Sequence, residues 1–469
     1  MRKFCLFIIN SFWLCNLHSQ NWVNIIDSMP GIGPYFQTGL IDSVTNTMYL
    51  GGTFNHVNNF ESKGIVKFDG IKFDTLADGL DPQWKGFNTP TIIKGMVMFQ
   101  NKLYVSGQFE KAGKYYSRNL ARWNGTDWDT TNFGLGTSSS AWYLKVYNNE
   151  LYVAGSFDSI GGIKSYNIAK YDGTNWHDIG YNYYNGCVSA IENYKGKLYM
   201  AGETAPGSSC TNLAYYDGIT WKPWYGILGG TNKTVTGMKV IDDKLFVYGR
   251  FNAIGGVPCN GLACWDGNKW IGYGRGVNPV YWATIWDVAK IDNELYASGI
   301  FDTLNDVANL NGIFNYHTNI AKFTNNKWCT FLEPTFGNIF FTLKYKNDIY
   351  FGGAMGEIGT YIKIRPLLKW TGGNSTITCG KTVTFPIDEV PSISNVYAIY
   401  PNPTNSILNI YDDQLDLQST NIKITNSLGQ LVLSLNYITQ LDLSSFANGM
   451  YYLTLQDNSI KKTIKIIKQ

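Results

Sequence analysis

Short apolar runs alternate with turn residues along this chain, and one such run recurs seven times between residues 48 and 353. Each copy carries an aromatic residue in second place and ends in glycine, as in Leu151-Tyr-Val-Ala-Gly155. The closing glycines are residues 52, 107, 155, 202, 249, 299 and 353, so neighbouring copies are 47 to 55 residues apart. A period near fifty residues, built from short strands, is typical of β-propeller blades. The pattern predicts an all-β fold with seven blades.

One repeat shows the blade that the pattern predicts. Residues 187–191, 197–201, 212–216 and 220–224 are short runs rich in aromatic and branched side chains, as strands are. Residues that tolerate positive φ separate them, such as Asn148-Asn149 and Asp172-Gly173 in the preceding repeat. Such pairs favour tight hairpins, so each repeat is predicted to be a four-stranded antiparallel meander.

A tryptophan follows the last turn of five repeats. Because a residue that recurs in every blade is most simply explained by packing between sheets, we expect these side chains to be buried rather than to bind sugars. They are Trp128, Trp176, Trp221, Trp270 and Trp328.

The seventh repeat reaches Trp370 and lacks this following tryptophan, whereas Trp22 stands before the first complete repeat. We therefore expect the strand around Trp22 to complete the seventh blade, which removes an open sheet edge. Deletion of residues 21–27 is expected to destabilise the whole ring. Residues 151–157 and 167–176 carry a phrase that resembles repeats of the kelch and galactose-oxidase-like propellers, and the resemblance covers residues 21–375.

The first twenty residues are typical of a secretory signal peptide. Arg2 and Lys3 precede a mostly apolar run from Phe4 to Leu14, which is too short to span a bilayer. Cleavage near residue 20 is expected, and no later segment approaches transmembrane length. The net charge of +3 and the lack of a polybasic run argue against nucleic acid as a partner.

Six cysteines remain after signal cleavage, and an exported protein can form disulfides. The pairings nearest in sequence are Cys187 with Cys210, Cys259 with Cys264, and Cys329 with Cys379. Buried free thiols are the alternative. The sequence contains no Cys-x-x-Cys pair, so it does not indicate structural zinc.

A polar linker, residues 376–395, leads to a tail of short alternating strands from residue 396 to 469, which predicts a small β-sandwich. The tail resembles the type A C-terminal sorting domain of the type IX (Por) secretion system. The residues that carry this resemblance are Tyr400, Pro401, Asn402, Pro403, Gly429, Gly449 and Tyr451. It implies a Bacteroidetes-type bacterium, recognition by the secretion machinery, and passage through the periplasm to secretion or attachment at the outer-membrane surface.

No catalytic constellation emerges from the sequence. The histidines of the mature chain, His56, His177 and His317, form no ligand pair, and no nucleophile elbow or EF-hand loop is present. The sequence therefore indicates no metal and no cofactor, and it leans against an enzyme without excluding one.

The loops between blades are rich in aromatic residues, which suit stacking on sugar rings or contact with protein loops. The alternative is that these side chains cap the blade ends. The candidate ligand-binding rim comprises Trp84, Phe87, Trp142, Tyr143, Tyr181, Tyr183, Tyr184, Trp224, Tyr225, Tyr281, Trp282 and His317. Three functions stay open: a surface binding or adhesion module for a glycan or protein, an extracellular carbohydrate-active enzyme, and a structural surface component.

Overall fold

A computed structural model gives the fold of the chain. It describes residues 22–30, 34–82, 91–129, 134–136, 140–181, 186–202, 212–224, 228–229, 233–259, 261–273, 284–301, 318–330, 335–357, 366–372, 378–382, 397–400, 404, 407–412, 420–436, 440–456 and 461–468. All the regular secondary structure within these ranges is β-strand, and none of it is helix. The predicted all-β class is therefore confirmed.

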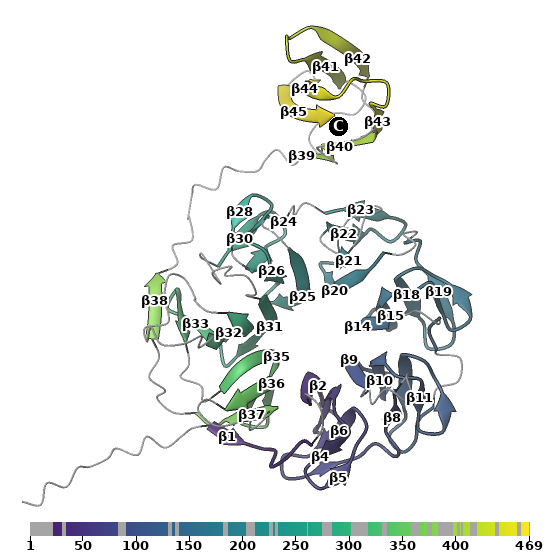
Figure 1. The fold of residues 1–469 in the computed structure, drawn as a ribbon, viewed down its shortest axis with the longest axis vertical. Helices are drawn as coiled ribbons and strands as arrows, with labels where there is room; N and C mark the ends of the chain where they lie inside the picture. Colours follow the sequence, from purple (N-terminus) through teal and green to yellow (C-terminus); the bar gives the residue numbers. More distant parts are fainter. Residues whose placement is uncertain are drawn as a thin grey trace, which may run out of the picture.

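Antiparallel meanders recur along the chain, each running from an innermost to an outermost strand (Figure 1). The innermost strands are β2 (Tyr35–Asp42), β9 (Ile92–Phe99), β14 (Ser140–Tyr147), β20 (Val188–Tyr194), β25 (Thr234–Ile241), β31 (Thr284–Ile291) and β35 (Thr335–Tyr345). The second strands, which carry the repeated glycine phrase, are β3 (Thr47–Thr53), β10 (Lys102–Gln108), β15 (Glu150–Ser156), β21 (Lys197–Gly202), β26 (Lys244–Arg250), β32 (Glu294–Phe301) and β36 (Asp348–Glu357).

The outer half of each meander is shorter. The third strands are β6 (Ile65–Phe68), β13 (Leu120–Trp123), β18 (Ile168–Tyr171), β22 (Asn212–Tyr216), β29 (Leu262–Trp265), β33 (Thr318–Thr324) and β37 (Leu367–Trp370). The fourth strands are β7 (Phe73–Asp74), β19 (Trp176–Asp178), β23 (Trp221–Pro223), β30 (Trp270–Gly272), β34 (Lys327–Thr330) and β1 (Trp22–Asn24), and a single Trp123–Trp128 bridge takes this place beside β13.

The sheets lie around a common centre, which the innermost strands face (Figure 1). Each innermost strand contacts the next one in chain order, and β35 contacts β2. The first two sheets are also joined edge to edge through the single pair Thr53–Ile92.

Strand β1 is the outermost strand of the sheet formed by β35, β36 and β37. Trp22 stands opposite Trp370 in this antiparallel pair, and their ring centroids are 4.8 Å apart. The Trp22 ring also packs 5.5 Å from the ring of Phe351. The predicted pairing of the N-terminal strand with the last repeat is confirmed.

The repeated tryptophans fill the spaces between neighbouring sheets, as predicted. Trp128, Trp176, Trp270 and Trp328 are buried, and Trp221 is half-buried. Three of the five indole N–H groups donate to a backbone carbonyl of the preceding repeat: Trp128 to Leu76, Trp221 to Ile179, and Trp328 to Tyr273, at 3.2, 3.1 and 2.9 Å. Each of these side chains therefore buries apolar area and satisfies its polar atom at the same time.

The tight hairpins between innermost and second strands form one end of the sheets, here called the turn end. Positive φ angles occur at the predicted turn residues, including 48° at Asn148 and 56° at Asn149. Side chains from this end reach the next sheet: Lys195 Nζ donates to the Asp266 carbonyl at 3.1 Å, and Tyr345 Oη donates to the Asn46 carbonyl at 2.6 Å. These contacts tie neighbouring sheets together.

Several repeats add a small hairpin, or a short strand beside one, between or after their main strands. These are β4 (His56–Val57), β5 (Phe60–Glu61), β8 (Leu80–Asp81), β11 (Lys111–Ala112), β12 (Tyr115–Tyr116), β16 (Ser159–Ile160), β17 (Ile163–Lys164), β24 (Leu228–Gly229), β27 (Ala253–Ile254) and β28 (Val257–Pro258).

Part of the predicted linker is itself a strand. Strand β38 (Thr378–Thr382) adds to the outer edge of β34, so the sixth sheet has five strands.

The tail has its own apolar core, which includes Leu408, Ile424, Leu453 and Ile466. Its strands are β39 (Tyr397–Tyr400), β40 (Ile407–Asp412), β41 (Asn421–Asn426), β42 (Leu431–Asn436), β43 (Gln440–Asp442), β44 (Gly449–Gln456) and β45 (Lys461–Lys468). They form a three-stranded and a four-stranded sheet, in line with the predicted small sandwich.

Candidate functional site

Every innermost strand contains a β-bulge at the same place in its pairing with the second strand. In β14, for example, Ala141 pairs with Gly155 and Tyr143 pairs with Ala154, so Trp142 has no partner. The seven bulged residues, here called the bulge ring, are Gln37, Lys94, Trp142, Ser189, Thr236, Trp286 and Phe340. Bulges re-aim side chains and are frequent beside functional sites.

The bulge explains why the repeated phrase ends in glycine. A Cβ atom built on Gly155 would lie 2.1 Å from the Ser140 carbonyl oxygen, and one on Gly107 would lie 2.0 Å from that of Ile92. The equivalent glycines of the other five repeats meet the backbone of the innermost strand at 2.0 to 2.5 Å. A Cβ atom does not fit there. The glycine that ends each copy of the phrase therefore marks where the innermost strand bulges.

All seven bulged side chains are at least partly accessible. Lys94 is exposed and the other six members of the ring are half-buried, whereas the residues on either side of Lys94 and of Ser189 are buried. Two pairs of neighbouring members are in contact: Lys94 Nζ lies 5.7 Å from the centroid of the Trp142 ring, and the rings of Trp286 and Phe340 lie 5.5 Å apart. Side chains of the ring therefore meet in at least these two pairs.

One arc of the bulge ring is held by internal contacts. The Thr236 hydroxyl donates to the Ile285 carbonyl, and Trp286 Nε1 donates to Asn338 Oδ1 at 3.1 Å. Trp286 and Phe340 meet edge to face at an interplanar angle of 71°. The side-chain polar atoms of Thr236 and Trp286 already have hydrogen-bond partners, so this arc offers chiefly aromatic surface.

Below the ring, charged residues of the innermost strands pair across neighbouring sheets. Lys145 Nζ lies 2.7 Å from Glu192 Oε1, and Lys239 Nζ lies 2.8 Å from Asp287 Oδ1. The other oxygen of Asp287 accepts the Thr342 N–H at 2.9 Å. These carboxylates are buried but satisfied, which is how a folded chain tolerates them.

Tyr143 links two sheets that are not neighbours. Its hydroxyl donates to the Thr236 carbonyl of β25, although β20 lies between β14 and β25 in the order of innermost strands. Burial, with a smaller effect of the Asp287 charge, raises the pKa of Tyr143 well above its usual range. The hydroxyl is therefore a structural donor at the centre of the molecule.

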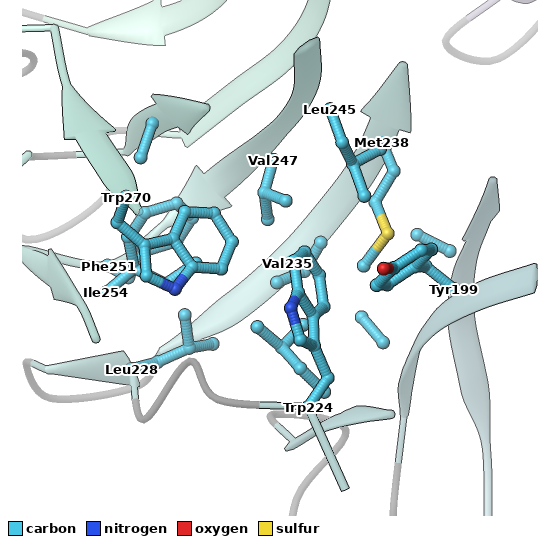
Figure 2. Packing of buried hydrophobic residues seen from close by; sticks show 14 of the residues in the cluster. Tyr199, Trp224, Leu228, Val235, Met238, Leu245, Val247, Phe251, Ile254 and Trp270 are labelled. Atoms are coloured by element: carbon cyan, nitrogen blue, oxygen red, sulfur yellow. The ribbon is translucent and has the colours of Figure 1, made fainter. Parts of the chain in front are cut away.

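Four of the twelve predicted rim residues fall within the described ranges. Trp142 and Tyr143 lie in strand β14 rather than in a loop between repeats, because the innermost strand begins at Ser140. Tyr181 and Trp224 are only 1% and 6% exposed. Trp224 packs among Tyr199, Leu228 and Trp270 between two sheets (Figure 2). The predicted rim is wrong for Tyr181 and Trp224, whose side chains fill the core.

The other eight predicted rim residues lie outside the described residues: Trp84, Phe87, Tyr183, Tyr184, Tyr225, Tyr281, Trp282 and His317. Of the bulge ring, the sequence prediction included only Trp142. A sequence signal does exist, since the bulged residue stands 13 positions before the repeat glycine in six repeats, as from Lys94 to Gly107.

The cysteine predictions divide three ways. Cys259 and Cys264 are buried free thiols, so the predicted disulfide between them is wrong. The reason is that Cys259 packs beside Trp270 on one side of its sheet, while Cys264 packs beside Phe246 on the other. Cys329 is disulfide-bonded and its backbone lies opposite Cys379, as the prediction requires.

Cys187 is also disulfide-bonded, and its predicted partner Cys210 lies outside the described residues.

The histidine prediction is partly covered by the described residues. His177 Nε2 lies 2.7 Å from Asp172 Oδ2 on an exposed hairpin, and His56 is exposed in β4. Within the described ranges, no three His, Cys, Asp or Glu side chains come together in a group that could hold a metal ion.

In the tail, the predicted sorting residues occupy turns and a core position. Gly429 has a φ of 79° in the turn between β41 and β42, a conformation that favours glycine. Tyr451 is buried, and its hydroxyl donates to the Ala447 carbonyl at 2.8 Å. Gly449 begins β44 and Tyr400 ends β39, while Pro401, Asn402 and Pro403 lie outside the described residues.

Comparison with protein families gives one match. Residues 398–469 match the secretion system C-terminal sorting domain, the family that the tail resembles in sequence. No curated protein matches the chain. The match indicates export: the protein is secreted or displayed at the cell surface, and the tail interacts with the type IX secretion machinery. Among the described residues, no helix has the length and apolar character needed to cross a bilayer.

The comparison with solved structures finds extracellular domains from B. thetaiotaomicron. The extracellular domain of a hybrid two-component system is 10% identical, with 92% of this chain and 72% of that one covered and a TM-score of 0.24. The extracellular domain of a one-component system is also 10% identical, with 96% and 99% covered and a TM-score of 0.21.

Proposed function

We propose that residues 21–375 form a closed seven-bladed β-propeller of the kelch and galactose-oxidase-like kind. The exported protein then acts outside the cell as a non-enzymatic binding module whose ligand is a glycan. The contact of β35 with β2 and the pairing of β1 with β37 support the closed ring. In a closed ring only the short outermost strand of each blade remains as a sheet edge, which limits pairing with other chains.

The bulge ring carries the binding proposal. The bulge is repeated in all seven sheets, but the side chain that it presents differs from sheet to sheet. Three members are aromatic, one is a cation, and three carry a hydroxyl or amide group. Aromatic faces with a few polar groups around them are typical of sugar-binding surfaces.

A glycan array with the exported protein tests the proposal. Wild-type protein is expected to retain a defined set of glycans, and Trp142→Ala and Trp286→Ala are expected to lose at least tenfold in affinity for them. Tyr116→Ala is the matched control, because Tyr116 is an exposed aromatic residue of the outer hairpin β11–β12.

Retention of no glycan, or an equal loss with Tyr116→Ala, would contradict the proposal. Release of shorter sugars from a retained glycan would favour the enzyme instead, and capture of a protein would favour a protein ligand.

A further inference from the structure

Lys94 differs from every other lysine of the innermost strands. Lys145, Lys239, Lys290 and Lys344 each form an ion pair with a carboxylate, of Glu192, Asp287, Asp242 and Asp292 respectively. Within the described residues, no carboxylate forms an ion pair with Lys94. A lysine that has no carboxylate partner among the described residues, while its counterparts on the other innermost strands have one, is available to an external anion.

The backbone holds Lys94 at a fixed place beside an aromatic ring. Both Lys94 and Trp142 are bulged residues of adjacent innermost strands, and Lys94 Nζ lies 5.7 Å from the Trp142 ring centroid. The strands approach closely here, since a Cβ atom on Gly95 would lie 3.0 Å from the Trp142 carbonyl oxygen. A cation over the face of an aromatic ring is stabilised, which orients the ammonium group.

The surroundings of the Lys94 ammonium group strengthen its attraction to an anion. The side chain is exposed, yet the chain around it desolvates the ammonium group and lowers the pKa of Lys94. An ammonium group that has lost part of its hydration gains more from a bound anion than a freely hydrated one does.

We propose that Lys94 and Trp142 form a subsite for an acidic sugar residue, whose anionic group contacts the Lys94 ammonium and whose ring lies on the Trp142 indole. Gln37 and Ser189, the bulged residues on either side of this pair, present an amide and a hydroxyl for the sugar hydroxyls. This inference rests on the proposed glycan-binding function and assigns it a ligand class.

The test compares sugars that carry a carboxylate, no charge or a sulfate. The exported protein is titrated with tetragalacturonic acid, with its fully methyl-esterified form, and with a sulfated galactan oligosaccharide that carries no carboxylate. Wild-type protein is expected to bind the free acid roughly 10- to 100-fold more tightly than the ester, the range for a charge-assisted hydrogen bond. The sulfated arm shows whether the anion is a carboxylate or a sulfate.

Three variants locate the effect. Lys94→Met is expected to remove the preference for the acidic sugar, and Lys94→Arg is expected to keep it. Lys111→Met is the matched control, because Lys111 Nζ lies 4.5 Å from the centroid of the Tyr116 ring on the outer hairpin and, like Lys94, forms no ion pair among the described residues. Thermal unfolding of each variant shows that it is folded.

The outcomes separate this inference from the proposed function. Glycan binding that depends on Trp142 but shows no preference for acidic over neutral sugars overturns the subsite and leaves the glycan function standing. An acid preference that survives Lys94→Met also overturns the subsite. Absence of binding to any glycan overturns both.

Discussion

The two ends of the innermost strands use the same kinds of residue in opposite ways. At the turn end, lysine and tyrosine side chains contact the neighbouring sheet, as Lys195 and Tyr345 do. At the bulge end, Lys94 has no carboxylate partner among the described residues, and Trp142 is half-buried beside it. At the turn end, both the backbone turn and the contact with the neighbouring sheet recur, which indicates a structural role. The bulge end repeats the backbone and varies the side chain, which is how a common scaffold presents a specific surface.

The largest expected effect comes from filling the space that the bulge needs. Gly155→Ala places a Cβ atom against the Ser140 carbonyl oxygen and should destabilise the protein by about 3 kcal/mol, because backbone must move. Gly180→Ala is the control: it has a φ of 72° but nothing within 4 Å, so only the backbone conformation costs energy, about 1 kcal/mol. Urea denaturation measures both, and equal losses would show that close approach is not what the glycine provides.

The second prediction concerns the N-terminal strand. Trp22→Ala should lower the free energy of unfolding by about 2 kcal/mol, since the half-buried ring packs on Trp370 and Phe351. Val23→Ala, at an exposed position of the same strand, should cost about 0.5 kcal/mol. Deletion of residues 21–27 should lower the midpoint of one cooperative unfolding transition. A truncated chain with an unchanged midpoint would rule out a sealing role for β1.

A third pair of variants sets the two ends against each other directly. Tyr345→Phe removes the hydrogen bond to the Asn46 carbonyl and should cost about 1 kcal/mol of stability. Lys94→Met should change stability by less than about 0.5 kcal/mol, because no ion pair within the described residues is lost. Differential scanning calorimetry measures both. A larger loss of stability for Lys94→Met than for Tyr345→Phe would show that Lys94 has a structural role.

The smallest effect is a pH dependence of the exposed outer hairpins. Backbone N–H groups, first that of Asn175, together with His177 lower the pKa of Asp172 to about 2, and backbone N–H groups also lower the pKa of Asp69 and Asp217. An unfolded aspartate titrates near 3.9. The folded pKa is the lower one, so this stabilisation is complete above about pH 4 and disappears as the pH falls toward 2.

Asp172→Asn keeps an acceptor in the same turn and loses the charge. The midpoint of thermal unfolding should therefore fall less steeply between pH 4 and 2 in the variant than in the wild type. Identical slopes would show that the turn carboxylate is not linked to folding.

Features that repeat in the sequence could be predicted, and features set by local register could not. The glycine phrase, the hairpin turns and the orphan strand at Trp22 predicted the order of strands and the β1–β37 pair. The bulge ring was not predicted, because a bulge is an irregularity in the pairing of two strands. It becomes visible only when the innermost strand is aligned with the repeat glycine 13 residues later, as Lys94 is with Gly107. Aromatic content alone misassigned Trp224, since surface stacking and core packing demand the same side chain.

The cysteines teach the same lesson at short range. Cys259 and Cys264 are close in sequence, yet they face different clusters on opposite sides of one sheet. Cys329 and Cys379 are far apart in sequence and are brought opposite each other by β38. Nearness in sequence therefore predicts a disulfide only where the fold also brings the two cysteines to the same place.

Hydrogen–deuterium exchange of the exported protein, with and without the tightest ligand from the glycan array, tests most directly whether the bulge end is the binding surface. The account predicts that ligand slows exchange in peptides covering residues 92–95 and 140–143 and leaves the turns at residues 100–101 and 148–149 unchanged. Protection confined to the turns, or to the outer hairpin at residues 111–116, would contradict it.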